Sequence, residues 1–227
     1  MRNLLIIILI TVIFSVNAQE KVTKRTFKIP KGSEIELNLK FGQNIIIEGW
    51  DKNEVEFEAV VLINGGLLND LHEIDFKSTD SYLIIESDFK NTRDNYSYFS
   101  NCQDNEHGYY RDGKGVCMEI NYRIKVPRNA DLSIESISGD IEIKGFYGEL
   151  WAKSISGFID LSWDTSKGAD LSMKTITGEL YSDIDLVILN KHKMASIVGY
   201  NMRAIHKGGG KRIHLETISS DIFLRKN

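Results

Sequence analysis

The sequence lacks several features that would point to particular classes of protein. After residue 14 no second long apolar run occurs, so no integral membrane segment is predicted beyond the N-terminus. The formal net charge is −4 with both signs interspersed, which argues against nucleic acid as a partner and supplies no polybasic patch for an anionic membrane. Two cysteines, and five histidines that share no ligand spacing, indicate no metal site, and no cofactor is implied.

Residues 1–18 have the pattern of a cleavable signal peptide. Arg2 gives a positive start, residues 4–14 are apolar apart from Thr11, and small or tolerated residues at 15–18 fit cleavage before Gln19. This apolar run is too short to cross a bilayer, which needs about 20 residues. We therefore expect an exported protein that is periplasmic, on the outer surface or secreted.

Cys102 and Cys117 are the only cysteines, and we predict that they form a disulfide. Oxidation is the default for cysteines in an exported chain. The bond would close a loop of roughly 15 residues, which the chain-entropy account values at about 3 kcal/mol.

A repeat fills the C-terminal half of the chain, with the pattern apolar-x-apolar-x-[Ser/Thr]-Ile-x-[Gly/Ser]-x-apolar. Its Gly or Ser position recurs at steps of 18 and then three times 21 residues, at Gly139, Gly157, Gly178, Gly199 and Ser220. Such regularity over five copies is typical of stacked repeat architectures.

Each copy is predicted to be strand, corner, strand. Apolar and polar residues alternate on both sides of the glycine, yet Ile134 and Ile141 are an odd number of residues apart, so the chain must turn between them. We expect the glycine to adopt a positive φ there. One copy cannot bury its own apolar face, so the prediction is an all-β fold with a single-stranded β-solenoid of about 21-residue rungs, in which Ile155 and Ile176 belong to the core.

The N-terminal half is predicted to be a related β-strand region. Residues 27–37 resemble residues 124–134, and the only two prolines of the chain occupy the same place in both segments, where each ends a strand. Further strands are expected at 55–63, 74–76 and 82–86, with one helical turn within 66–72. The predicted organisation is a signal peptide (1–18), an N-terminal β region (19–123) with an inserted loop (90–115), and the solenoid repeats (124–227).

The inserted loop is rich in Asn, Asp, Tyr and Gly and has no alternating apolar pattern, which indicates a long surface loop. Aromatic and arginine side chains suit interfaces, so a binding role for protein or sugar is one interpretation. A disulfide-pinned cover over an edge of the N-terminal sheet is the other. The candidate binding residues are Tyr96, Tyr98, Phe99, His107, Tyr109, Tyr110 and Arg111.

Three motifs carry a resemblance to a known family: Lys-Val-Pro-Arg-Asn-Ala-Asp-Leu at 125–132, the repeated Ser-Ile-Ser-Gly-x-Ile, and Ile-Glu-Gly-Trp-Asp at 47–51. In these the chain resembles the DUF4097-type β-strand-repeat proteins, exported bacterial proteins often described as adhesin-like. The resemblance implies a β-solenoid protein of the cell envelope and brings no catalytic residues. Segment 90–115 departs from the family pattern.

No arrangement of residues in the sequence indicates catalysis. The hydroxyl column at 136, 154, 175, 196 and 217 fits side chains that satisfy backbone groups at a corner better than an exposed hydroxyl array. We therefore expect a non-enzymatic binding or structural protein, with an unknown protein or glycan at the cell envelope as its partner. The alternatives are a carbohydrate-active solenoid enzyme and a component of an envelope-stress regulatory system.

Overall fold

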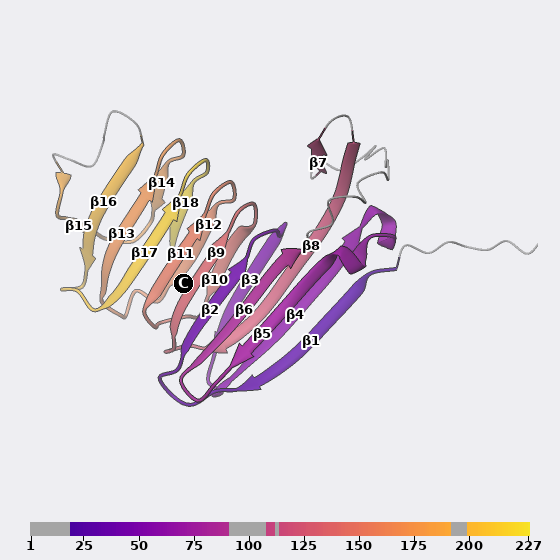
Figure 1. Cartoon of the computed structure of the whole chain (residues 1–227). Helices are drawn as coiled ribbons and strands as arrows, with labels where there is room; N and C mark the ends of the chain where they lie inside the picture. Colours follow the sequence, from indigo (N-terminus) through magenta and orange to yellow (C-terminus); the bar gives the residue numbers. More distant parts are fainter. Residues whose placement is uncertain (1–18, 91–107, 112–113, 192–198) are drawn as a thin grey trace, which may run out of the picture.

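Two mixed β-sheets packed face to face make up the protein, as the computed structural model shows (Figure 1). The structure describes residues 19–90, 108–111, 114–191 and 199–227, with the backbone alone at 108–111 and 114–116. The predicted signal peptide lies outside the described residues. The described elements are strands apart from two short 3₁₀ turns, so the predicted all-β architecture is confirmed.

Each sheet holds nine strands. Along the hydrogen-bonded order, sheet A contains β1 (Lys21–Lys28), β4 (Glu54–Ile63), β8 (Lys114–Pro127), β3 (Asn44–Trp50), β10 (Asp140–Lys144), β12 (Ile159–Trp163), β18 (Ile222–Lys226) and β14 (Leu180–Ser182), and β7 (Gly108–Arg111) pairs with β8. Sheet B contains β15 (Val187–Ile188), β16 (Tyr200–His206), β13 (Ala169–Thr175), β17 (Lys211–Thr217), β11 (Leu150–Ser154), β9 (Asp131–Ser136), β2 (Glu34–Leu39), β6 (Tyr82–Phe89) and β5 (His72–Ser78).

The strand–corner–strand prediction is confirmed in the described copies. In the first three copies and the last, the first strand lies in sheet B and the second in sheet A, as in β9 and β10 or β11 and β12, whereas β16, which follows Gly199 of the fourth copy, lies in sheet B. Neighbouring copies pair in parallel with equivalent residues opposite each other: Leu150 faces Leu132, and Ile159 faces Ile141. The apolar alternation of each strand thus faces the space between the sheets.

The N-terminal half joins the same two sheets. β2 pairs in parallel with β9 so that Ile35 faces Leu132, which is the register that the match between 27–37 and 124–134 predicts. β1 ends before Pro30 and β8 ends at Pro127, as expected. The predicted strands correspond to β4, β5 and β6, and the helical turn is found as two 3₁₀ turns, η1 (Asn64–Gly66) and η2 (Asn69–Leu71). Strand β8 of sheet A crosses residues 123 and 124, and β2 pairs with β9 in sheet B, so both sheets continue through the predicted domain boundary.

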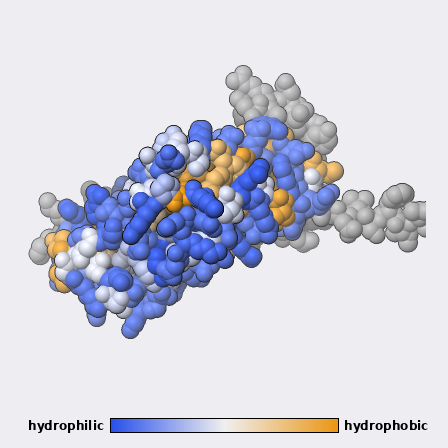
Figure 2. Space-filling view, turned by 90° about the horizontal axis from the view of Figure 1, so that it is seen from below, coloured by the Kyte–Doolittle hydropathy of each residue, from blue (hydrophilic) through white to orange (hydrophobic). Residues whose placement is uncertain are grey.

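One apolar core fills the space between the sheets. Its largest fully buried side chains are Trp163, Tyr122, Phe57 and Phe146. The outer faces carry mainly polar side chains, and the side seen in Figure 2 is largely hydrophilic, with an apolar strip along its middle and smaller apolar patches toward both ends. Burial of one face of each sheet accounts for the alternating sequence.

The strand order does not support the predicted single-stranded solenoid. A solenoid stacks its copies in sequence order, whereas the last copy, β17 and β18, lies between the second copy and the third. In addition, β16 runs antiparallel to β13. Insertion gives β17 and β18 a hydrogen-bonded neighbour on each side, which satisfies backbone groups that an end position would leave open.

The isoleucines at the corners point toward solvent, although the sequence predicts that they belong to the core. Ile155 and Ile176 are each 37% exposed, so their assignment to the core is wrong, and it is the hydroxyl of the preceding residue that is buried. Ser154 Oγ donates to the Gly139 carbonyl (3.1 Å) and accepts from the Gly157 N–H (2.9 Å). This confirms the corner role of the hydroxyl column at 136, 154, 175 and 217, while position 196 lies outside the described residues.

The repeated glycine is needed for a different reason than predicted. A positive φ is found at Gly199 but not at Gly139, Gly157 or Gly178. At Gly157 an added Cβ would stand 2.0 Å from the Gly139 carbonyl oxygen. Glycine is required here because stacked corners approach each other too closely for any side chain.

The interpretation of 90–115 as a loop throughout is also wrong in part. β7 forms an antiparallel hairpin with the first residues of β8, with Tyr109 opposite Val116 and Arg111 opposite Lys114. β8 extends past the other strands to reach this hairpin (Figure 1). No alternating apolar pattern marked these strands, since they pair outside the two-sheet core.

Candidate binding face

A groove of about 560 Å³ lies on the outer face of sheet B, over β5, β6, β2, β9 and β11. Outward side chains of these strands form most of its lining, together with residues at the corners that follow β2, β9 and β11 and the buried Ser87 and Ser136. The lining residues are Glu36, Asn38, Lys40, Asp75, Glu86, Ser87, Asp88, Glu135, Ser136, Ile137, Lys153 and Ile155.

Strand register aligns the polar lining into one continuous row across sheet B. Each residue of the row lies directly opposite a residue of the row on the neighbouring strand, so the side chains lie close together on one face of the sheet. From β5 to β13 the row, here called the polar row, reads Asp75, Glu86, Asn38, Glu135, Lys153, Glu216 and Lys174. It is acidic over β5 and β6 and alternates in charge from β9 to β13.

Ion pairs fix several carboxylates of this face. Burial by itself would raise the pKa of Asp88, but a hydrogen bond from Lys40 and the Phe89 N–H (2.8 Å) hold that pKa below its usual value. Burial opposes the shift at Glu216 as well, where Lys174 (3.1 Å) lowers the pKa of the carboxyl. These groups are charged at neutral pH and hold defined positions.

An apolar row borders the groove at the corners. Ile137, Ile155 and Ile176 are 37–38% exposed, and Ile218 is half-buried. Backbone hydrogen bonds stack the corners in the order 137, 155, 218 and 176, for example from the Ser156 N–H to the Ile137 carbonyl (2.9 Å). We call these four residues the isoleucine row. Exposed apolar side chains that adjoin one another commonly mark interaction surfaces.

An aromatic pair lies on the opposite side of the polar row. The rings of Trp151 and His214 stack at 6.0 Å with an interplanar angle of 11°. Lys153 Nζ lies 6.0 Å from the centre of the Trp151 ring. The outer face of sheet B thus carries apolar, charged and aromatic rows side by side, and we call this surface the binding face.

The binding residues predicted from sequence are not those of the binding face. Tyr96, Tyr98, Phe99, His107 and Cys102 lie outside the described residues. The backbone of Tyr109, Tyr110 and Arg111 belongs to β7, and Cys117 lies in β8, where its N–H donates to Asn64 Oδ1 (2.8 Å). The disulfide and the binding role of this segment therefore stay predictions.

Sequence reasoning missed the binding face although a signal was present. Inward positions in the first strand of a copy are Leu132, Ile134 and Ser136, an unbroken period of two. Counting that period through the serine would have placed Ile137 outside. The polar row could not be found in this way, because its members are aligned by pairing between distant strands.

The chemistry of the binding face suits recognition more than catalysis. Lysines engage its carboxylates at Asp88, Glu86 and Glu216, and the groove is open to solvent. Among the described residues, no three His, Cys, Asp or Glu side chains converge to hold a metal ion. The same part of the chain has no helix with the length and apolar character to span a membrane.

Comparison with known proteins gives a fold relationship and no family. No protein-family model matches the chain. No curated protein matches it either. Among solved structures it is similar to a "putative cell adhesion protein" from Clostridium sporogenes ATCC 15579, with a TM-score of 0.58, 11% identity, and coverage of 92% of this chain and 100% of the other. At this identity the similarity shows a shared fold alone.

Other solved structures, among them the following two, match with TM-scores too low to support an argument. One is a "putative adhesin" from Bacteroides fragilis NCTC 9343, with a TM-score of 0.23, 10% identity, and coverage of 91% and 97%. The other is a "putative lipid binding protein" from Parabacteroides distasonis ATCC 8503, with a TM-score of 0.25, 11% identity, and coverage of 91% and 96%.

Proposed function

We propose that this protein is a non-enzymatic, adhesin-like binding protein of the cell envelope that engages its partner through the binding face. The observation that carries the proposal is the groove, where the polar row and the isoleucine row meet over five strands. Such a surface offers charged groups that can pair with a partner, next to apolar side chains that a partner can bury, and recognition sites commonly combine the two. The similarity in fold to a protein named for cell adhesion supports the same role.

Export completes the proposal. The signal-peptide pattern of residues 1–18 and the resemblance to the DUF4097-type proteins both favour a location in the periplasm, on the outer surface or outside the cell. The partner class is a protein or a glycan of the envelope. We propose the disulfide between Cys102 and Cys117 and the loop around it as a second, independent contact element.

A binding screen tests the proposal. The mature protein is applied to a glycan array and to immobilised envelope proteins, and any interaction is measured again with Lys153→Glu. The control is Lys144→Glu on β10 of the opposite sheet, an exposed lysine, whereas Lys153 is half-buried. We expect Lys153→Glu to weaken binding at least about tenfold, as loss of a central charged contact does, and Lys144→Glu to leave it unchanged.

Two results would overturn the proposal. Equal effects of the two lysine variants would move the site away from the binding face. Turnover of a polysaccharide that a single carboxylate-to-amide substitution abolishes would show a carbohydrate-active enzyme instead. Urea unfolding of each variant confirms that a loss of binding does not reflect a loss of folding.

A further inference from the structure

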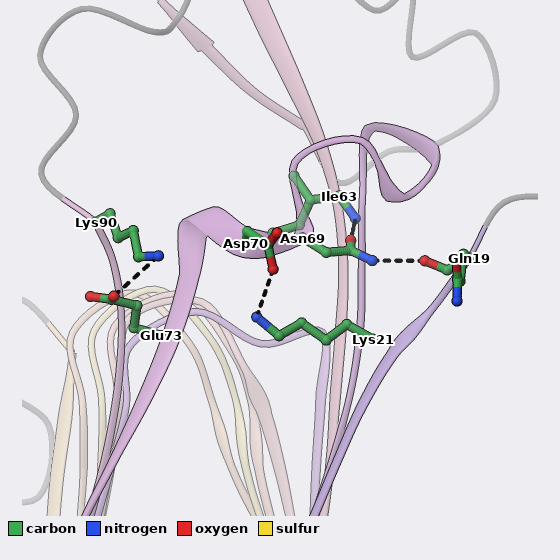
Figure 3. A network of polar contacts seen from close by, with 7 residues as sticks. All are labelled: Gln19, Lys21, Ile63, Asn69, Asp70, Glu73 and Lys90. Carbon is green, nitrogen blue, oxygen red and sulfur yellow. Dashed lines mark hydrogen bonds and ion pairs between the residues drawn. The ribbon is translucent and has the colours of Figure 1, made fainter.

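The start of β1 is held by a small cradle built from the turn between β4 and β5. The Asn69 side chain is buried and makes two hydrogen bonds: its amide donates to the Gln19 carbonyl (2.7 Å), and its oxygen accepts from the Ile63 N–H (2.7 Å) (Figure 3). One asparagine therefore connects the end of β4 to Gln19, which lies two residues before the start of β1.

Gly66 completes the cradle. Its φ is +96°, a conformation that favours glycine, and an added Cβ would stand 2.7 Å from the Gln19 carbonyl oxygen and 3.1 Å from the Gln19 nitrogen. The backbone of Gln19 thus packs directly on that of Gly66. Next to it, Lys21 Nζ pairs with Asp70 at 3.2 Å (Figure 3). Residues 66–70 together fix the backbone of residue 19, whereas the Gln19 residue as a whole is exposed.

The cradled residue is the one that the predicted cleavage would turn into the mature N-terminus. Cleavage after Ala18 gives Gln19 a free α-amine on the same residue as its side-chain amide. Attack of the amine nitrogen on the side-chain carbonyl carbon forms a five-membered lactam. The bond between that carbon and the side-chain nitrogen breaks, and the nitrogen leaves as ammonia. This exchange of one amide for another needs no oxidant, reductant or cofactor.

We propose that Gln19 is a modification site, where the mature N-terminus is closed as a pyroglutamyl residue seated in the cradle of Asn69 and Gly66. The cradle suits the lactam, because cyclisation keeps the backbone carbonyl that Asn69 binds. It also removes the ammonium charge from a nitrogen that packs on Gly66 and is therefore less accessible to water on that side. The proposal rests on the signal-peptide cleavage that the proposed function includes.

Mass spectrometry of the exported protein tests the proposal. The full chain with its own leader is produced in a bacterial host, recovered after export, and its N-terminal peptide is sequenced. We expect a peptide that starts at residue 19 and is lighter by one ammonia molecule than the unmodified sequence. A peptide that starts at Gln19 with its full mass would refute the cyclisation and leave export intact. A peptide with another start would refute both the cleavage after Ala18 and the modification of Gln19, and a chain that keeps its leader and stays in the cytoplasm would refute export.

Asn69→Asp tests the cradle separately. The carboxylate still accepts from the Ile63 N–H but has no donor for the Gln19 carbonyl. We expect amide hydrogen exchange in residues 19–22 to become about tenfold faster, which corresponds to the loss of one hydrogen bond of about 1.4 kcal/mol. Asn38→Asp, on the exposed face of β2, is the matched control. Unchanged exchange at the N-terminus in Asn69→Asp would show that the cradle does not seat this residue.

Discussion

Replacing Ser154 with alanine is expected to destabilise the fold far more than replacing Ser156, although the two changes remove the same hydroxyl two residues apart. The Ser154 hydroxyl is buried and links the Gly139 carbonyl to the Gly157 N–H, so it joins two consecutive corners. Without it, both backbone groups lose that partner in a place where water does not replace it. At roughly 1–3 kcal/mol for each of the two unsatisfied buried groups, the expected cost of Ser154→Ala is about 2–6 kcal/mol.

Ser156 and Ile155 supply the controls. Ser156 is exposed, so its substitution by alanine should change the free energy of unfolding by less than about 0.5 kcal/mol. Ile155→Ala removes a partly exposed side chain and should cost about 1 kcal/mol. Urea unfolding monitored by circular dichroism gives the free energy of unfolding of the three variants, provided that its dependence on urea concentration has the same slope in each. If Ser154→Ala were no worse than Ser156→Ala, the account of the buried hydroxyl corners would be wrong.

Two further predictions concern a buried histidine and a closely packed glycine, and a third concerns the predicted disulfide. Burial, reinforced by the nearby charge of Lys21, lowers the pKa of His72 from 6.5 to about 4. The free energy of unfolding should therefore be constant above pH 6.5 and fall by about 3 kcal/mol as the pH drops from 6.5 to 4, which urea unfolding at a series of pH values measures. The same dependence of stability on pH in His72→Phe would contradict this prediction. Gly157→Ala should cost about 3 kcal/mol because of overlap with a neighbouring carbonyl, whereas Gly208→Ala, in open space at φ +78°, should cost about 1 kcal/mol by the same unfolding assay. Protein from an oxidising compartment should show no free thiol at Cys102 and Cys117, and a non-reducing digest that yields two separate thiol peptides would disprove the bond.

Most of the strands could be predicted from the local alternation of apolar and polar residues in the sequence. Alternation with period two identified β4, β5 and β6 and the strand–corner–strand unit, because a residue's face on a strand depends only on its position along that strand. The two prolines aligned residues 27–37 with 124–134, and the register of β2 against β9 agrees. Apolar partners in equivalent positions favour the same register wherever two copies meet, so register too is contained in the sequence.

Tertiary structure alone decided which copies are neighbours. Ile213 faces Leu150 on one side and Leu171 on the other, so both pairs place two buried apolar side chains opposite each other. Since every copy presents the same apolar columns, the repeat gives almost no energetic preference for one stacking order over another. The order depends on how β16 and the turn at 207–210 direct the chain back into the sheet, and the solenoid prediction failed for this reason.

The binding face and the cradle were beyond the sequence for a related reason. Glu135 and Lys153 become neighbours only through strand pairing, and Asn69 reaches Gln19 across 50 positions of the chain. Polar side chains at such separations carry no periodic signal, because their positions are set by which strands lie side by side. The amino-acid sequence therefore determined which residues form strands and which of their faces are buried. The packing of those strands determined which exposed side chains could act together.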